Sequence, residues 1–167
     1  MKKIYDVIII GAGPAGLFAA YELIEHNKKL NILLLDEGKF AENRFCPMSQ
    51  NNGKCLNCKP CNILSGYGGA GTFSDGKLTT GINSAYCKTV LETFVKFGAP
   101  EEILYTSKPH IGTDNLIHIL KNIRKYILVH GGTFLFNTKF IDFEKINNQI
   151  SKVYIQDVSD SSKKILQ

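Results

Sequence analysis

Three glycines near the start of the chain have the spacing GxGxxG, at Gly11, Gly13 and Gly16. The apolar run Ile4–Ile10 leads into them, and Pro14 follows just inside a predicted helix. In such a turn the first glycine permits a sharp strand-to-helix reversal, the second lets the backbone approach a pyrophosphate, and the third lets helix and strand pack closely. Free N–H groups at the helix start face the phosphate charge. The pattern therefore predicts a dinucleotide-binding turn made by Gly11, Gly13, Pro14, Ala15 and Gly16.

A second apolar run, Asn31–Leu35, ends in the carboxylate of Asp36, 20 residues beyond Gly16. At the end of the second strand of such a unit, a carboxylate accepts hydrogen bonds from a ribose. It also repels the extra phosphate of NADP, so this position favours FAD or NAD. We include its neighbour Glu37 among the cofactor-binding candidates. The alternative is a βαβ unit whose glycines only form a turn and whose Asp36 is solvated.

Residues 37–64 show neither helical nor strand periodicity, and 28 residues is long for a connection, so they predict an inserted loop that is functional or disordered. Four cysteines lie in it, the last three as CLNCKPC. Consecutive CxxC spacings bring sulfurs together, as in zinc and iron–sulfur sites. The candidate metal ligands are Cys46, Cys55, Cys58 and Cys61. A redox thiol–disulfide pair and a set of reduced thiols without a task are the alternatives. Arg44, in the same loop, is a candidate for a phosphate contact.

Six glycines fall within the 17 residues Ser65–Gly81. So many permissive backbone positions are costly in conformational entropy, which argues against a purely structural role. They let a backbone wrap closely around a flat or anionic ligand, and polar side chains among them provide hydrogen bonds. The candidate ligand-binding residues here are Gly69, Ala70, Gly71, Ser74, Asp75 and Gly76. A flexible linker is the alternative.

The rest of the chain alternates helical and strand patterns. The predicted elements are, in order, helices over Ser84–Phe97 and Asn115–His130, and strands over Thr133–Asn137, Phe140–Ile146, Ile150–Asp157 and Lys163–Leu166. Thr113 or Asp114 is the predicted cap of the second helix, and Asn147-Asn148 is a hairpin signal. With Thr133–Asn137 placed beside the first strand, the elements predict an α/β fold. Its core is a parallel, Rossmann-like FAD/NAD(P)-binding βαβαβ unit with an attached antiparallel β-meander.

The composition is that of a globular domain, with 20 Lys and Arg against 15 Asp and Glu among 167 residues. The net charge of +5 comes from scattered lysines, so no nucleic-acid partner is predicted. The uncharged run Val7–Tyr21 is shorter than the roughly 20 residues that cross a bilayer, and its glycines interrupt any continuous helix. We therefore predict a cytoplasmic protein without a membrane partner, whose cysteines are thiols or ligands rather than disulfides. Cys87, on a predicted helix, should be a small buried residue.

The strings GAGPAGLFAA, LLLDEG, GGAGTFSDGKL and KPHIGTDNL, with the cysteine loop between the second and third, resemble a family of bacterial FAD-dependent dehydrogenases related to the glutathione-reductase-like FAD oxidoreductases. Some members are similar in the CxxCxxC loop as well. The resemblance implies FAD, with Gly11, Gly13 and Gly16 at the pyrophosphate, Asp36 at the adenosine ribose and Gly68–Gly76 beside the ribityl or isoalloxazine. Members of that family continue through a substrate-facing domain, so residues 1–167 are predicted to be the N-terminal part of an FAD/NAD(P)-binding domain, apparently truncated.

The predicted function is the FAD-binding portion of a flavin-dependent oxidoreductase that acts on an unknown small-molecule substrate or electron donor. The flavin would carry the redox chemistry, so no catalytic side chain is assigned. His110, just ahead of a helix, is a weaker candidate for a proton donor. Two alternatives remain: a metal or iron–sulfur redox module built on the four loop cysteines, and an inactive truncated remnant that lacks a C-terminal half.

Overall fold

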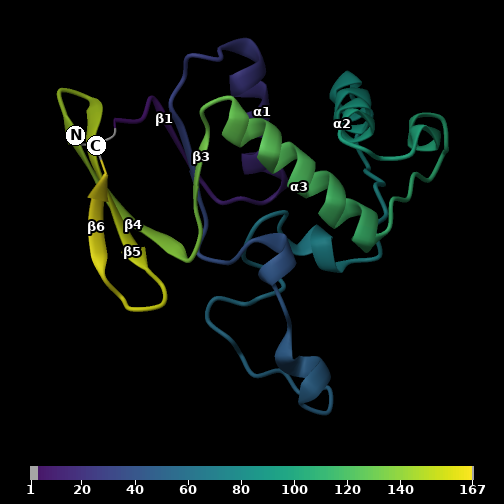
Figure 1. The fold of residues 1–167 in the computed structure, drawn as a ribbon, viewed down its shortest axis with the longest axis horizontal. Coiled ribbons are helices and arrows are strands. Elements are labelled where there is room, and N and C mark those ends of the chain that lie inside the picture. Colours follow the sequence, from purple (N-terminus) through teal and green to yellow (C-terminus); the bar gives the residue numbers. More distant parts are fainter. Residues whose placement is uncertain (1–3, 167) are drawn as a thin grey trace.

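The computed structural model describes residues 4–166, which fold as two sheets and three α-helices (Figure 1). The strands and helices are β1 (Val7–Ile10), α1 (Pro14–His26), β2 (Ile32–Leu35), α2 (Ala85–Lys96), α3 (Thr113–Val129), β3 (Thr133–Leu135), β4 (Thr138–Ile146), β5 (Gln149–Asp157) and β6 (Lys163–Leu166). Four short 3-10 turns complete the elements: η1 (Ala41–Asn43), η2 (Pro47–Gln50), η3 (Ala70–Phe73) and η4 (Glu101–Leu104). The α/β fold predicted from the sequence is confirmed.

The first three strands form a parallel sheet in the order β1-β2-β3. Val7 pairs with Ile32 in the β1–β2 register, and Leu33 pairs with Thr133 in the β2–β3 register. The third strand therefore lies beside the second, and its predicted place beside the first is wrong. All four residues of β2 are buried, whereas β1 ends in the exposed Ile10. The strand that is apolar on both faces takes the centre of the sheet.

The sheet separates two hydrophobic layers, with helices on one face and the meander on the other (Figure 1). Ile32 and Leu34 pack in the cluster that includes residues of all three α-helices. Leu33 and Leu35 point to the opposite face and pack with Val153 and other meander residues. Successive side chains of a strand alternate between the faces, so one run of four apolar residues serves both cores.

The last three strands form an antiparallel sheet in the order β4-β5-β6, which confirms the predicted meander. Asn147 and Asn148 join β4 to β5 with φ angles of 50° and 62°. Two successive residues in the left-handed region define the hairpin turn that matches strand twist, and Asn tolerates it better than most residues. The hairpin expected from this pair of residues is therefore present.

The helices start and end within a few residues of their predicted limits, but one cap differs. The hydroxyl of Ser84 accepts a hydrogen bond from the N–H of Tyr86 at the start of α2, as an N-cap should. Gly112 is the N-cap of α3, with φ of 83° and no side-chain cap. Thr113 and Asp114 lie inside the first turn, so the cap predicted at one of them is wrong. The residue before α3 has a positive φ angle, and a backbone conformation with positive φ favours glycine.

The two ends of the predicted inserted loop lie side by side, next to the parallel sheet. Lys39 and Gly66 form an isolated parallel bridge, and the N–H of Tyr67 donates to the carbonyl of Lys39 at 3.0 Å. Between these residues the chain runs through η1 and η2 and extends away from the sheet, at the bottom of Figure 1. No helix among residues 4–166 is long and apolar enough to cross a membrane.

Candidate functional site

The glycine turn between β1 and α1 has the geometry that its residue types predict. Gly11 has φ of 98°, in the left-handed region. A Cβ at Gly16 would lie 2.0 Å from the carbonyl oxygen of Gly11, so helix and strand meet only because this residue has no side chain. Pro14 stands at the first helical position, and the first-turn N–H groups that follow it have no partner inside the helix.

Gly13 differs from its neighbours because the chain itself does not require glycine there. Its φ of −69° is open to any L-residue, and a Cβ would meet nothing within 4 Å. The open space lies at the N-terminal end of α1, where the partial positive charge of a helix favours an anion. A glycine that faces empty space at a helix start fits the close approach of a pyrophosphate.

The Asp36 carboxylate accepts hydrogen bonds from two backbone N–H groups, one in the glycine turn and one two residues further along its own segment. Its Oδ2 accepts the N–H of Ala12 at 2.7 Å, and its Oδ1 accepts the N–H of Gly38 at 2.8 Å. The side chain is buried, but it lines a cavity of about 350 Å³. A carboxylate offers about four acceptor sites, so ribose hydroxyls would still find free lone pairs on it. Asp36 thus joins the glycine turn to the end of β2 and faces the cavity as well.

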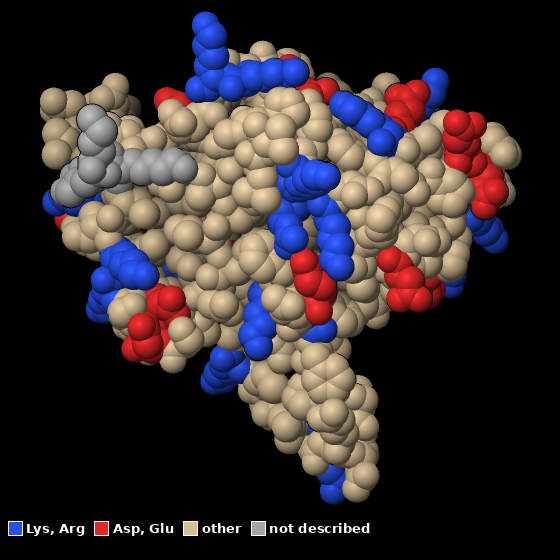
Figure 2. All heavy atoms as spheres, viewed as in Figure 1, with Lys and Arg blue, Asp and Glu red and all other residues tan. Residues whose placement is uncertain are grey.

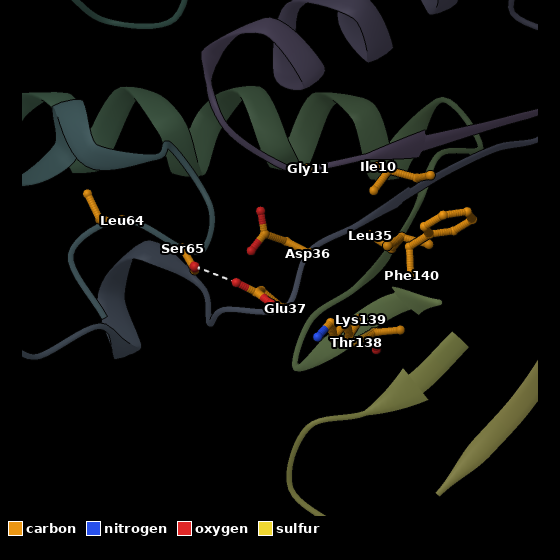
Figure 3. A pocket seen from close by; sticks show the side chains of 10 residues that line it. All are labelled: Ile10, Gly11, Leu35, Asp36, Glu37, Leu64, Ser65, Thr138, Lys139 and Phe140. Atoms are coloured by element: carbon orange, nitrogen blue, oxygen red, sulfur yellow. Dashed lines mark hydrogen bonds between the residues drawn. The ribbon is translucent and has the colours of Figure 1, made fainter. Parts of the chain in front are cut away.

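The cavity lies at the carboxyl ends of β1 and β2, beside the start of β4 (Figure 3). Its lining residues are Ile10, Gly11, Leu35, Asp36, Glu37, Leu64, Ser65, Thr138, Lys139 and Phe140. Figure 3 shows the Glu37 carboxylate within hydrogen-bond distance of Ser65, whose hydroxyl donates to Oε1 at 2.9 Å. Crevices at the carboxyl ends of parallel strands are where ligands bind in open α/β sheets.

The glycine-rich segment lies against the glycine turn. The N–H of Gly68 donates to the carbonyl of Ala12 at 2.9 Å, and a Cβ at Gly69 would lie 3.1 Å from Pro14 Cδ. A second cavity, of about 490 Å³ and mostly apolar, lies between them; its lining includes Pro14, Ala15, Gly68, Gly71, Ser74 and Gly76. The turn thus borders one cavity through Gly11 and the other through Pro14 and Ala15.

Two candidates of this segment point elsewhere. The exposed Asp75 side chain forms an ion pair with Lys77 at 2.6 Å, and the hydrogen bond from Lys77 lowers the pKa of the Asp75 carboxyl. Ala70 is exposed at the start of η3. His110 lies with Nε2 2.6 Å from the carbonyl oxygen of Asp75, on the short bridge between residues 77 and 110. Neither Asp75 nor His110 lines either cavity.

Arg44 holds the inserted loop in place. Its guanidinium donates to the carbonyls of Asn62 at 2.9 Å, Tyr67 at 3.0 Å and Gly69 at 2.9 Å, and also to that of Ile63. Burial lowers the pKa of this guanidinium from its ordinary value, although an arginine stays charged at neutral pH. Because four of its five N–H groups already bind carbonyls, the structure gives Arg44 a positioning role rather than the expected phosphate contact.

The four loop cysteines do not come together. Cys46 precedes η2, Cys55 is exposed, and Cys58 and Cys61 are half-buried on another part of the loop. Within residues 4–166 no group of three or more His, Cys, Asp or Glu side chains is placed to hold a metal ion. The predicted zinc or iron–sulfur site is therefore not supported. Cys87 is half-buried rather than buried, since α2 turns that face toward solvent.

Sequence reasoning missed the residues at the start of β4. Thr138 and Lys139 line the cavity beside Asp36, and the N–H of Thr138 donates to the carbonyl of Asp36 at 2.9 Å. A signal was available, because they follow the end of the third parallel strand and strand ends share one sheet edge. The prediction left them between two strands, Thr133–Asn137 and Phe140–Ile146, whereas β4 begins at Thr138.

The chain is similar in sequence to several known proteins. A model of the lycopene cyclase protein family matches residues 6–54, the segment with the glycine turn and Asp36. An uncharacterised protein of Clostridium beijerinckii is 41% identical over 148 residues, which are 87% of this chain and 26% of that protein. The mitochondrial L-2-hydroxyglutarate dehydrogenase of Dictyostelium discoideum is 40% identical over 58 residues, 34% of this chain and 12% of that enzyme.

Among solved structures, the chain is similar to the glycerol-3-phosphate dehydrogenase of Bacillus halodurans in complex with FAD. The TM-score is 0.56 at 15% identity, over 98% of this chain and 32% of that one. The fold is therefore that of Rossmann-type FAD oxidoreductases, and the resemblance expected from the sequence is confirmed. The chain spans about a quarter of the Clostridium relative and a third of the dehydrogenase structure.

Proposed function

We propose that this chain forms the FAD-binding portion of a flavin-dependent dehydrogenase. The observation that carries the proposal is Gly13, a glycine at a helix start that faces open space and that the fold itself does not need. Beside it stands Asp36, a buried carboxylate held at the edge of a cavity. Together they supply the pyrophosphate and ribose contacts that a dinucleotide requires.

In this proposal the parts of FAD follow the two cavities. The adenosine occupies the cavity beside Asp36, Glu37 and the start of β4, with the ribose hydroxyls on Asp36. The pyrophosphate lies against the glycine turn, where first-turn N–H groups of α1 face it. The flavin half extends toward the glycine-rich segment. A Cβ at Gly71 of that segment would also meet nothing within 4 Å, so the backbone there leaves room for a ligand.

Bound FAD would supply the two-electron chemistry, while the chain binds and orients it. The substrate is a small molecule whose identity these residues do not specify. The shared region is 26% of the Clostridium relative. We infer that groups facing the substrate, and further contacts to the dinucleotide, would come from sequence outside that region. This chain alone would then hold the dinucleotide only weakly.

Calorimetric titration with FAD, ADP and FMN tests the proposal. FAD and ADP should bind saturably and FMN should not, because FMN lacks the adenosine half that Asp36 would recognise. Gly13→Ala should weaken FAD binding at least tenfold, which is about 1.4 kcal/mol. Gly13 is the N-cap of α1, a position where Gly is preferred over Ala, so the thermal unfolding midpoint should fall slightly.

Gly81→Ala is the matched control, since a Cβ there also meets nothing within 4 Å but lies outside the glycine turn. It should bind FAD as the unmodified chain does. FMN binding as tightly as FAD, or equal affinity in the Gly13→Ala variant, would refute the assignment of the site.

A further inference from the structure

The loop cysteines form two overlapping CxxC pairs, Cys55 with Cys58 and Cys58 with Cys61. The structure distinguishes them. Cys58 and Cys61 line one cavity of about 470 Å³ between the loop and the β5–β6 end of the meander. Cys55 is exposed and does not line it; its Sγ accepts the N–H of Asn57 at 3.3 Å instead. Of the two pairs, only the second therefore lines a common, open cavity in which a small molecule could meet both sulfurs.

Cys61 lies in the part of the loop that Arg44 fixes. The buried guanidinium donates to the carbonyls of Asn62 and Ile63, the two residues after Cys61. The turn closes with the N–H of Ser65 on the carbonyl of Cys61 at 2.9 Å. Backbone N–H groups of Leu64 and Ile63, and then the charge of Arg44, lower the pKa of the Cys61 thiol. The thiolate is the attacking form in disulfide exchange.

The cavity wall carries charge of both signs. Glu37 and Asp157 provide carboxylates, and Lys59 and Lys139 provide ammonium groups. Such a wall suits a ligand that itself carries both carboxylate and ammonium groups. The cavity shares Glu37, Ser65 and Lys139 with the cavity beside Asp36, so the pair lies on the adenosine side of the proposed dinucleotide site and away from the glycine-rich segment.

We propose that Cys58 and Cys61 carry out thiol–disulfide exchange with a low-molecular-weight zwitterionic disulfide, of the type of oxidised glutathione. The Cys61 thiolate attacks one sulfur of R–S–S–R, forms a mixed disulfide and releases one thiolate. Cys58 gives up its proton and attacks the Cys61 sulfur, which releases the second thiolate. The chain gains one disulfide and loses two electrons, while the ligand takes these electrons and the two protons to become two thiols. The exchange does not require bound FAD.

The test uses the full chain, reduced and desalted without oxygen, then incubated with oxidised glutathione. Remaining thiols are alkylated and counted by mass spectrometry. Because Pro60 follows Lys59, trypsin leaves Cys55, Cys58 and Cys61 on one peptide, and variants must assign the bond. The unmodified chain and Cys55→Ser should each lose two thiols to one internal disulfide. Cys58→Ser should stop at one bound glutathione on Cys61, and Cys61→Ser should form no internal bond.

Cys87, half-buried on α2, is the internal reference thiol. In the Cys58→Ser variant, Cys61 should react with oxidised glutathione at least tenfold faster than Cys87. Loss of the disulfide in Cys55→Ser, or equal rates at Cys61 and Cys87, would overturn the proposal. So would one equivalent of zinc bound to the purified chain and released by alkylation of the cysteines.

An uncharged disulfide, 2-hydroxyethyl disulfide, tests the ligand class. It should oxidise the Cys58–Cys61 pair at least several-fold more slowly than oxidised glutathione at the same concentration, when each rate is expressed relative to that of Cys87. Equal relative rates would refute recognition of a zwitterion. Circular dichroism of each serine variant checks that the fold is kept.

Discussion

At the scale of single residues, two glycines of the same turn occupy their positions for different physical reasons. Gly16 is required by the fold, because any side chain would collide with the Gly11 carbonyl. At Gly13, three positions earlier, an added Cβ would meet no protein atom within 4 Å, and we propose that a ligand approaches there. Two charged residues differ in a similar way. Asp36 lines a cavity that a ligand could enter, whereas the Arg44 guanidinium donates its hydrogen bonds to backbone carbonyls of the chain itself.

Gly16→Ala should lower the free energy of unfolding by about 1–3 kcal/mol or more, the usual cost of forcing extra volume into a close-packed contact. The new Cβ would lie 2.0 Å from the Gly11 carbonyl oxygen, so α1 must move away from β1. Urea unfolding followed by circular dichroism measures the change. Gly13→Ala is the control and should destabilise the chain less than Gly16→Ala, because it loses only the preference for Gly at the N-cap of α1. Equal destabilisation by the two substitutions would contradict the packing argument.

Arg44→Met keeps the length of the side chain but removes the donors that four carbonyls share. The Gly69 carbonyl keeps the N–H of Thr72 at 3.4 Å, and those of Asn62, Ile63 and Tyr67 lose the guanidinium. We expect a loss of about 1–3 kcal/mol in unfolding free energy, as for buried groups left unsatisfied. Limited proteolysis should then cut within residues 45–64 much faster.

Arg124→Met is the control for that substitution. Arg124 makes a partly exposed ion pair with Glu42 at 3.1 Å and lies over the Phe40 ring, but it is not among the donors to the carbonyls that Arg44 holds. Partly exposed ion pairs contribute about 0–1 kcal/mol. Arg124→Met should leave the proteolysis rate nearly unchanged. If Arg44→Met left that rate unchanged as well, Arg44 would not be what holds the loop.

At the scale of elements, the three α-helices are joined by polar contacts at one partly exposed point beside their shared core. Glu25 of α1 accepts hydrogen bonds from Tyr126 of α3 and from Lys96 of α2, the latter at 3.1 Å. Lys96 also donates to the Tyr21 hydroxyl at 2.9 Å and lies over three aromatic rings. The bond from Tyr126 is the main cause of a lowered pKa at Glu25.

The lowered pKa of Glu25 predicts acid sensitivity at this junction. A carboxyl whose folded pKa lies below its unfolded pKa stabilises the fold above the unfolded value and loses that contribution as pH falls through the folded value. Glu25→Gln should therefore reduce the fall in unfolding free energy between pH 5 and pH 3. At pH 7 its cost should be about 0–1 kcal/mol, because the pair is partly exposed. Thermal unfolding across this range measures it; parallel curves for both chains would contradict the linkage.

At the scale of the whole molecule, charge is dispersed, and part of the exposed apolar surface lines one groove. Figure 2 shows Lys and Arg interspersed with Asp and Glu on the face it presents. A groove of about 610 Å³ runs between β1 and the meander, lined by Ile8, Phe143, Ile150 and other residues. Beside it β1 is an edge strand of its sheet. An unpaired edge next to exposed apolar side chains favours association.

Ile150→Lys should reduce self-association of the chain, because Ile150 is 64% exposed in this groove and a charge there opposes burial. Sedimentation velocity at increasing protein concentration measures the shift toward the monomer. Ile82→Lys is the control, since Ile82 is 72% exposed but does not line the groove. An equal shift in both variants would show that total apolar exposure, and not the groove, drives association.

The sequence by itself determined the features that depend on neighbours a few residues apart. The glycine turn, the helix limits and the Asn147-Asn148 hairpin follow from backbone preferences and from side-chain periodicity, which act over one or two turns of chain. For the same reason the position of Asp36 at the end of β2 was predictable, since the end of an apolar run marks the end of the strand.

Only the tertiary structure decided which distant segments meet. It placed β3 beside β2, brought Thr138 and Lys139 to the Asp36 cavity, and gave Cys58 and Cys61 a common cavity that neither Cys46 nor Cys55 lines. It also buried Arg44 among carbonyls 18 to 25 residues away. The physical reason is that such contacts arise from packing apolar faces between segments far apart in the chain, and local spacing does not encode that choice.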